Sequence, residues 1–380
     1  MLTKGIQLKI MIGPVIPVPA PQVVIDALDS VQVTSAAGSA SGFQMSFQFN
    51  SKSELNTIFL LAGAMNSGPA TPPLRVMLIM ILNGTPQPLF DGVMTHIEVQ
   101  AGKSGSPGTV TVTGEDLTKA MNMIDFSGMP YPAMPIEARV AVICAKYAAF
   151  GLVPLIIPVL FPDIPIPIER IPAHQGTDLE YLQQLAEEAG YVFYIEPGPV
   201  AGTNIAYFGP EIKIGVPQPA LNVDMDALTN VENMSFSFDP TQGVLPIVFI
   251  QNQMTRVPIP IPIPDFNPLQ PPLGVLSTPL SNLKMLKETA KMNAAQAVSA
   301  GLNEARKSQD SVTANGSLNV LRYGRVLKAR QLVGVRGAGI AYDGLYFVKS
   351  VTSTLKRGEF KQSFNLTRNG LISITPRVPV

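Results

Sequence analysis

The sequence predicts a mainly β fold of the α+β class, with helices concentrated in its middle. Alternating apolar and polar residues fill the first third of the chain. A helix with clear start and stop signals lies near residue 180, and alternating patterns return after residue 324. Alternation with a period of two is typical of strands that bury one face. A chain of 380 residues is long enough for two or three domains.

The first third carries strand patterns separated by turn signals. Residues 42–50 alternate Phe or Met with polar residues, and residues 75–82 form an uninterrupted apolar run, which is typical of a strand covered on both faces. Asn83-Gly84 is a turn signal, and residues 108–114 alternate again. The residues that follow predict a short helix ending at Met121.

Two helices are predicted in the middle of the chain. Residues 136–151 place apolar side chains at helical spacing, including Cys144, which we therefore interpret as a core residue rather than a nucleophile. The clearest helix covers residues 178–189. It begins with a capping box, in which Thr177 and Glu180 each satisfy a free amide of the first turn.

Proline marks two apolar stretches, residues 153–172 and 257–272. Because proline lacks an amide donor, these stretches are predicted to be extended rather than helices or central strands. Residues 281–309 lack proline and are rich in Ala, Lys, Leu, Met and Glu, so one or two helices are predicted there. Further strands are predicted at 324–335, 344–352 and 360–367.

The charge content is low and unevenly distributed. Charged residues make up 14% of the chain, against a usual share of about 25%, which indicates surfaces buried in an assembly. The net charge of zero argues against a specific nucleic-acid partner. Residues 1–250 hold 10 basic and 21 acidic residues, and residues 251–380 hold 17 and 6. Two interpretations stay open: two domains of different composition, or acidic and basic faces that meet head to tail around a ring.

Composition also bears on the compartment. A single cysteine excludes an internal disulfide and suits assembly in a reducing cytoplasm. The longest uncharged stretch, between Lys146 and Asp163, is shorter than the roughly 20 residues of a spanning helix, and prolines interrupt it. No membrane span is therefore predicted, and the first residues do not resemble a signal peptide.

No constellation of residues indicates catalysis or a cofactor. The two histidines, His96 and His174, have no partners at metal-ligand spacing. The glycines within 334–339 lack the order and the following helix of a dinucleotide site, so we interpret them as a tight turn. No enzymatic activity, metal or cofactor is predicted.

Three segments carry a resemblance to a known family. Residues 176–196 read GTDLEYLQQLAEEAGYVFYIE, a capped helix followed by an aromatic strand. Residues 324–370 contain a glycine turn, the motif DGLYFVKSV and a strand ending in Arg, and residues 89–117 give a weaker match. Together they resemble the late control protein D family of contractile phages and the hub portion of VgrG spike proteins. The resemblance covers about two thirds of the chain, in the right order. The proline-rich stretches and the lack of a C-terminal needle depart from it.

The resemblance implies two tube-like β-barrel domains joined by a mixed α/β middle region. The expected domains are residues 1–125 and 231–380 for the barrels and 126–230 for the middle region. The second barrel domain would include a proline-rich strap at 257–272 and a helical segment at 281–309. The residues expected to shape the barrels, the capped helix and the interfaces are Phe90, Gly92, Asp178, Leu179, Leu182, Asp343, Gly344 and Tyr346.

The resemblance also implies a function. The chain would be a structural baseplate hub, a homotrimer that adapts a six-fold inner tube to a three-fold spike in a virion tail or an extracellular injection particle. Its implied partners are further copies of itself, the inner tube protein and a separate spike protein, with wedge, tape-measure and cargo proteins as further candidates. Two alternatives stay open, a tail-tip receptor- or glycan-binding protein and a cell-wall hydrolase. The lack of Trp and of catalytic residues disfavours them.

Overall fold

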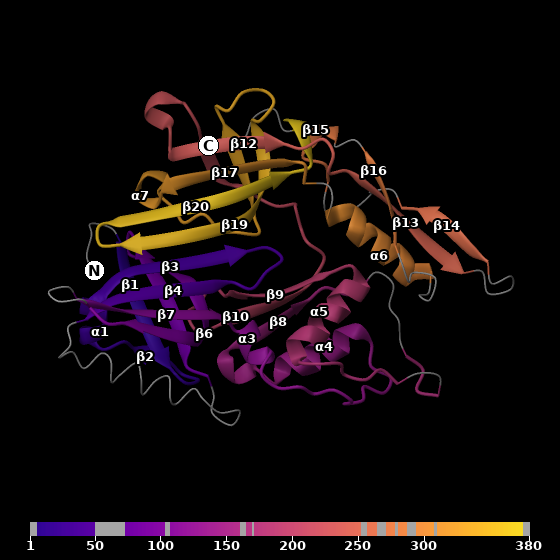
Figure 1. The fold of residues 1–380 in the computed structure, drawn as a ribbon, viewed down its shortest axis with the longest axis horizontal. Helices are drawn as coiled ribbons and strands as arrows, with labels where there is room; N and C mark the ends of the chain where they lie inside the picture. The colour runs from indigo at the N-terminus through magenta and orange to yellow at the C-terminus, as the bar shows by residue number, and fades with distance from the viewer. Residues whose placement is uncertain are drawn as a thin grey trace.

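The computed structural model describes residues 6–49, 73–102, 107–159, 165–168, 171–251, 257–263, 271–277, 280–286, 294–307 and 310–374. These residues form a mainly β protein with a helical middle region (Figure 1). The prediction of a mainly β fold is thereby confirmed, and the two tube-like barrel domains stay a prediction.

The strands fall into three groups along the chain. Those up to residue 116 are β1 (Ile6–Gly13), β2 (Val18–Pro19), β3 (Leu28–Ala36), β4 (Gly42–Phe49), β5 (Arg75–Leu82), β6 (Thr85–Gln100) and β7 (Gly108–Asp116). Those of the middle are β8 (Leu152–Ile156), β9 (Val192–Pro197), β10 (Asn204–Gly209) and β11 (Gln218–Asn222). The remainder are β12 (Val231–Phe238), β13 (Val244–Gln251), β14 (Pro258–Pro262), β15 (Gly274–Ser277), β16 (Asn282–Met285), β17 (Val312–Asn319), β18 (Leu332–Arg336), β19 (Gly344–Lys356), β20 (Glu359–Arg368) and β21 (Gly370–Ser373).

The helices are short and are interspersed among the strands. They are α1 (Gln22–Ala27), α3 (Thr118–Met121), α4 (Ile136–Ala145), α5 (Asp178–Ala189), α6 (Ala294–Lys307) and α7 (Val320–Tyr323), with single 3-10 turns η1 (Ala148–Phe150) and η2 (Asp226–Leu228).

One large sheet contains the same four-stranded arrangement twice. Its order is β12-β17-β20-β19-β3-β4-β7-β6-β5-β1-β2, with β18 beside β19 and β11 beside β18. We call β3, β4, β7 and β6 the first unit and β12, β17, β20 and β19 the second unit. In both units the strand that comes first in the chain lies beside the second, the second beside the fourth, and the fourth beside the third. All these neighbours are antiparallel. The chain therefore carries a topological duplication.

The two units meet where β3 pairs with β19, a contact that we call the seam (Figure 1). The strands are antiparallel, in a register that runs from Ala36 opposite Ser350 to Ser30 opposite Lys356. Thr34 and Thr352 face each other there, with their hydroxyl oxygens 3.1 Å apart. Among the described strands, the pairings form an open path rather than a closed barrel.

The faces of the two units differ sharply in chemistry. One face buries a single apolar core that contains residues of both units, such as Phe47 and Phe360. The other, which we call the polar face, is formed mostly by uncharged hydroxyl and amide side chains. Its members, strand by strand, are Asn233, Ser235, Ser237, Thr313, Asn315, Ser317, Ser363, Asn365, Thr352, Thr354, Gln32, Thr34, Gln44, Ser46, Thr111 and Thr113. This separation follows from the period-two alternation of the strands.

The middle region has a core of its own. Helices α3, α4 and α5 pack with the small sheet β8-β10-β9, whose β8 lies at an edge, as its prolines require. The capping box of α5 is present, since Thr177 Oγ1 accepts the amide of Glu180 while the Glu180 carboxylate accepts the amide of Thr177. Gly190 ends the helix in the left-handed conformation.

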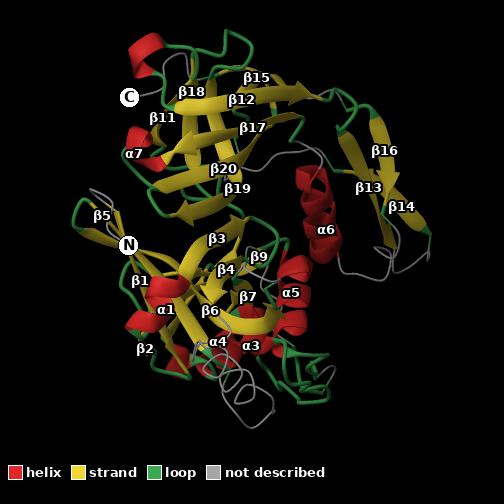
Figure 2. Ribbon diagram, turned by 60° about the vertical axis from the view of Figure 1, so that its left-hand side comes forward, coloured by secondary structure: helices red, strands yellow, loops and turns green. Residues whose placement is uncertain are grey.

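An insertion separates β12 from β17, which pair directly up to Phe238 and Val312. Its strands β13, β14 and β16 form a small sheet that lies on α6, and α6 in turn contacts α5 (Figure 2). The amide of Ile263 donates to the carbonyl of Pro246, so the isoleucines of the Ile-Pro repeat direct their amides toward β13. The proline nitrogens, which carry no hydrogen, therefore face the outer edge of β14. That edge has no amide at these positions to pair with another strand.

Three secondary-structure predictions need correction. The expected helical segment at 281–309 contains α6, but residues 282–285 form β16, because pairing with β13 overrides their helical preference. Residues 287–293 of that segment and 264–270 of the strap lie outside the described residues. The helix expected at 136–151 ends at Ala145 and is followed by η1.

The third correction concerns the strand expected at 324–335. It begins only at Leu332, because residues 324–331, which follow α7, form a loop. The side chain of Asn319 caps α7 by accepting the amide of Leu321, and Gly324 ends it with a φ of 81°. The glycines at 337 and 339 do form the predicted turn, with φ values of 85° and 93°.

The capping box gives a first testable prediction. Replacing Thr177 by Ala leaves the amide of Glu180 without its acceptor, so the free energy of unfolding should fall by about 1 kcal/mol. Urea denaturation measures this loss. The matched control is Gln183→Ala, an exposed position of the same helix, which should change stability little. Equal losses in the two variants would contradict the role of the cap.

Candidate functional site: the junction of the two units and the middle region

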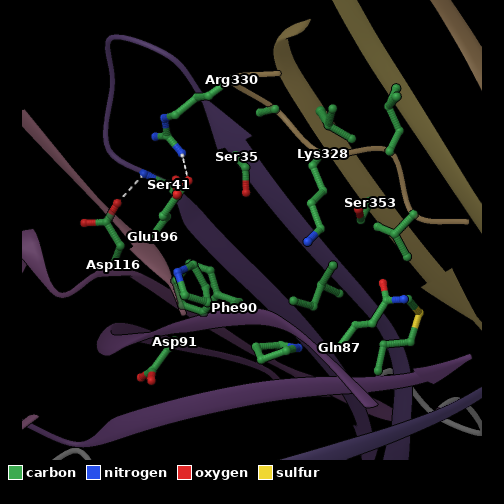
Figure 3. Close-up of a pocket in the computed structure, with 18 of the residues that line it drawn as sticks. Ser35, Ser41, Gln87, Phe90, Asp91, Asp116, Glu196, Lys328, Arg330 and Ser353 are labelled. Carbon is green, nitrogen blue, oxygen red and sulfur yellow. Dashed lines mark hydrogen bonds and ion pairs between the residues drawn. The ribbon is translucent and has the colours of Figure 1, made fainter. Parts of the chain in front are cut away.

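A cavity of about 140 Å³ lies beside the seam, where the first unit, the middle region and the loop before β18 meet (Figure 3). Its walls combine apolar side chains with a high share of polar ones. The labelled lining residues are Ser35, Ser41, Gln87, Phe90, Asp91, Asp116, Glu196, Lys328, Arg330 and Ser353. The cavity therefore marks the point at which the three regions are held together.

Arg330 is the central contact of this junction. Its guanidinium donates to the carbonyl of Ala36 on β3 at 2.6 Å, lies 3.8 Å from the Glu196 carboxylate of β9, and stacks 4.2 Å from the ring of Tyr194. The backbone amide of Arg330 donates to the carbonyl of Val348 on β19 at 2.8 Å. One residue thus contacts both strands of the seam and the middle region.

The backbone of Arg330 is held in an uncommon conformation. Its φ is 62°, in the left-handed region that costs a residue with a side chain of order 1 kcal/mol. Its side chain is only 8% exposed, and its Nε has no hydrogen-bond partner among the described residues. Such a conformation persists only where the surroundings fix it, so the contacts of the guanidinium outweigh the strain.

A second buried arginine ties the first unit to the middle region. Arg75 on β5 makes a two-pronged ion pair with Asp91 on β6, with distances of 2.7 and 2.6 Å. Both side chains are 3% exposed. The guanidinium also donates to the carbonyl of Gly202, and Asn204 donates to the same carboxylate at 2.9 Å. The ion pair therefore binds β5 and β6 to the start of β10.

The remaining acid of the cavity is engaged in a loop contact. Burial raises the pKa of Asp116 above its ordinary value, whereas its hydrogen bonds act in the opposite direction. Its carboxylate accepts the amide of Ser41 at 2.7 Å and the amide of Thr118 at 3.0 Å. A raised pKa can indicate a catalytic acid. Here the carboxylate instead fastens the β3–β4 loop to the start of α3.

Close packing accounts for the two sequence-predicted residues on β6, Phe90 and Gly92. Phe90 is buried and lies 5.1 Å from the ring of Phe43. A Cβ atom on Gly92 would lie 2.2 Å from the carbonyl oxygen of Glu115 and 2.7 Å from the Phe90 ring. Glycine is therefore needed for the approach of β6 to β7. Of these two residues, only Phe90 lines the cavity.

The sequence-predicted residues at the start of β19, Asp343, Gly344 and Tyr346, lie around another buried arginine, Arg368. Its guanidinium donates to the carbonyls of Asp343, Ala341 and Gly370 at 2.7–2.8 Å and lies 4.5 Å from the ring of Tyr346. A Cβ atom on Gly344, whose φ is 125°, would clash with the side chain of Ser373. These three predicted residues thus come together and shape the loop before β19.

The predicted residues of the capped helix lie elsewhere, in the core of the middle region. Asp178 is fully buried and accepts hydrogen bonds from Lys146 and from the Tyr147 hydroxyl, each at 2.9 Å. Leu182 is fully buried, and Leu179 packs at the border of the same core. None of the three lines the cavity.

The described residues offer little for catalysis. Cys144 is buried, and burial raises the pKa of its thiol to about 12, so it stays protonated. Within the described ranges, no three His, Cys, Asp or Glu side chains are grouped as a metal site would need. No described helix is both long and apolar enough to cross a membrane.

Sequence reasoning missed the charged contacts of the junction. Arg75, Glu196 and Arg330 stand in unrelated stretches of the chain, and no short motif links them. The only sequence signal that could have found them is the low charge content. Where charged residues are few, each charged position is a stronger candidate for a specific contact. Arg368 was noted only as the end of a strand in the family motif.

The Arg75–Asp91 pair yields a prediction. Replacing Arg75 by Met leaves Asp91 buried without its counter-charge, so the free energy of unfolding should fall by about 3–5 kcal/mol. The matched control is Lys119→Met, which breaks the exposed ion pair with Glu115 and should cost less than about 1 kcal/mol. Denaturant titration of both variants measures this. Equal losses in the two variants would show that burial does not increase the contribution of the Arg75–Asp91 pair to stability.

His174 gives a prediction on pH. Burial lowers the pKa of His174 below the ordinary value of 6.5, so the unfolded chain takes up the proton first. The free energy of unfolding should fall between pH 7 and pH 5, by at most about 1.4 kcal/mol per pH unit from this residue. His174→Gln should reduce that slope, because it removes the buried imidazole. If the free energy of unfolding has the same pH slope in the wild type and in His174→Gln, the lowered pKa of His174 is contradicted.

No family model matches the sequence, and no curated protein matches it either. Solved structures do match over nearly the whole chain. A tail protein from Neisseria meningitidis gives a TM-score of 0.59 at 14% identity, covering 97% of this chain and 98% of the other. The 43 kDa tail protein of prophage MuSo2 from Shewanella oneidensis gives 0.61 at 14% identity, with coverages of 96% and 98%.

A third match comes from a complex that contains a VgrG protein. A chain of the PdpA–VgrG complex of Francisella gives a TM-score of 0.61 at 8% identity, covering 99% of this chain and 55% of that chain. At such identities the likeness is one of fold. This chain has the fold of the phage tail and VgrG-like proteins.

Proposed function

We propose that the chain is a structural, non-enzymatic baseplate hub: a homotrimer that adapts a six-fold inner tube to a three-fold spike. The observation that supports this most is the topological duplication. Each chain supplies two four-stranded units of the same topology, joined edge to edge at the seam. Three chains would therefore present six similar units, while the particle as a whole keeps only three-fold symmetry.

The distribution of mass about the sheet supports a ring with the polar face inside. The apolar core, α1, α7 and the cavity with the middle region all lie behind the opposite face. In a closed ring the bulk of each chain has to lie outside, because the interior has no room for it. The polar face would then line a water-filled passage, for which hydroxyl and amide side chains are suited.

We propose the domains on this basis. The barrel-like domains are residues 1–125 and 231–380, each supplying one unit, and residues 126–230 form the middle region between them. The buried arginine contacts would hold the two units at a fixed angle, as a load-bearing ring requires. Phe90, Gly92, Asp343, Gly344 and Tyr346 would serve that geometry rather than contact a partner.

Partners would attach above and below the ring, and on its outer side. An inner tube protein would stack on the six units, and a separate spike protein would bind at the three-fold end. The likeness of this fold to tail proteins and to a chain of a VgrG complex supports such partners. The particle would be a virion tail or an extracellular injection device, assembled in the cytoplasm.

The mass of the purified protein in solution tests this proposal. Light scattering should give three times the mass of one chain. If acidic and basic regions of neighbouring chains pair, the trimer should weaken at high salt, because exposed charges are then screened. A protein that stays monomeric at every salt concentration, and does not associate with co-expressed tube and spike proteins, would contradict the hub.

A further inference from the structure

Another cavity, of about 150 Å³, lies within the apolar core, and we call it the apolar cavity. Strands β4, β5, β6 and β7 supply one wall, whereas β1, β2, α1 and the residues that join them supply the other (Figure 1). It shares no lining residue with the cavity at Arg330, so the two are separate. Its buried lining residues are Ala20, Val24, Met45, Val76, Met94 and Val112.

The lining of the apolar cavity excludes polar guests. Among the described residues, every side chain that lines it is apolar. Backbone groups of the lining bond to one another: the carbonyl of Leu74 accepts the amide of Met94 at 2.9 Å. The carbonyl of Pro21 likewise accepts the amide of Val24 at 3.0 Å. A water molecule in a protein interior needs several polar partners, so this lining suits neither water nor a polar ligand.

The wall formed by β2 and α1 is fixed in place and does not collapse into the space. The amide of Ala20 donates to the carbonyl of Ile10 on β1 at 2.9 Å, which ties this wall to the sheet. Pro19 and Pro21 flank Ala20, and proline restricts the φ angle of the backbone. Helix α1 follows at once and buries only Val24. Small side chains on a fixed backbone therefore leave the cavity unfilled.

The apolar cavity reaches the surface beside β2. Val18 lines it and is 61% exposed. Pro19 and Pro21 also line it, and both are exposed. A small molecule can therefore enter between these side chains while the strands stay paired. The rim is itself apolar, so an apolar guest meets no charged or hydrogen-bonding group on its way in.

We propose that the apolar cavity is a binding site for small, uncharged, apolar molecules of about the size of benzene. Apolar cavities of about 150 Å³ stay dry and accept benzene or xenon. The binding free energy comes from removing the guest from water and from contacts with lining atoms that otherwise face empty space. All the lining residues belong to one chain, so binding does not depend on the proposed hub or on its assembly.

The chemistry of the lining also predicts selectivity. Phenol has nearly the shape of benzene but carries a hydroxyl group, which loses its hydrogen bonds to water when it enters an apolar site. An apolar pocket rejects such an added hydroxyl by up to about 100-fold. Benzene should therefore bind more tightly than phenol.

Two methionines that line the cavity provide a direct readout. The full-length protein, labelled with ¹³C at its methionine methyl groups, is titrated with benzene and observed by NMR. The methyl signals of Met45 and Met94 should shift and then saturate. Met121, which is equally buried but lies in the core of the middle region, should not shift. A titration with phenol should need a higher ligand concentration for the same shift.

A matched pair of variants on α1 tests the location. Val24→Phe fills the cavity from within, so benzene should no longer shift the two methionine signals. Val23→Phe makes the same change at the neighbouring position, which is 49% exposed, and should bind benzene as the wild type does. Ala20→Leu fills the same space from another point of the wall and should also abolish binding. The melting temperature of each variant checks that it folds.

The outcomes decide the inference in either direction. Saturable shifts at Met45 and Met94 that are lost in the folded filled variants and kept in Val23→Phe would support the site. No shift at the highest soluble benzene concentration would overturn it. Shifts that persist in both filled variants would place benzene elsewhere, and equal affinities for benzene and phenol would contradict an apolar site. None of these results depends on whether the protein is a trimer.

Discussion

The antiparallel pairing of β3 with β19 is the contact on which the rest of the structure depends. It joins strands that are far apart in the chain, such as Thr34 and Thr352, whose positions differ by 318. Closing so long a loop is costly in conformational entropy, and the reward is a single apolar core shared by both units.

Buried arginines reinforce this arrangement in a chain that is otherwise poor in charge. Arg330 holds the seam to the middle region, Arg75 holds the first unit to the same region, and Arg368 fixes the loop that leads into β19. Each donates to backbone carbonyls of segments distant in sequence, so each selects one relative placement of them. Burying a charge is expensive, and the Arg75–Asp91 contact offsets this through paired hydrogen bonds. Together these contacts fix the seam, the middle region and the loop before β19 in one relative placement.

The sequence was informative wherever a local pattern determines local structure. The alternation of residues 42–50 and 108–114, the capping box at Thr177 and the core position of Cys144 all follow from short-range rules. The helical segment expected at 281–309 does contain α6, but its start was wrong, because pairing with β13 holds residues 282–285 in β16. The start of the strand expected at 324–335 was also wrong, because a loop precedes β18. The seam, the cavity and Arg330 could not be predicted, since they arise from contacts between segments that no periodicity connects. The motif around Asp343 was recognised as a pattern, and the structure supplies its cause in Arg368.

Native-state hydrogen exchange tests the central claim, that the seam makes the two units one cooperative body. If the claim holds, amides within residues 30–36 and 350–356 that bond across the seam exchange only with global unfolding, as slowly as those in the interior pairs of β4 with β7. Exchange of the seam amides at the faster rate of a free edge such as β12, while each unit stays protected, would show that the units separate easily and would contradict the account.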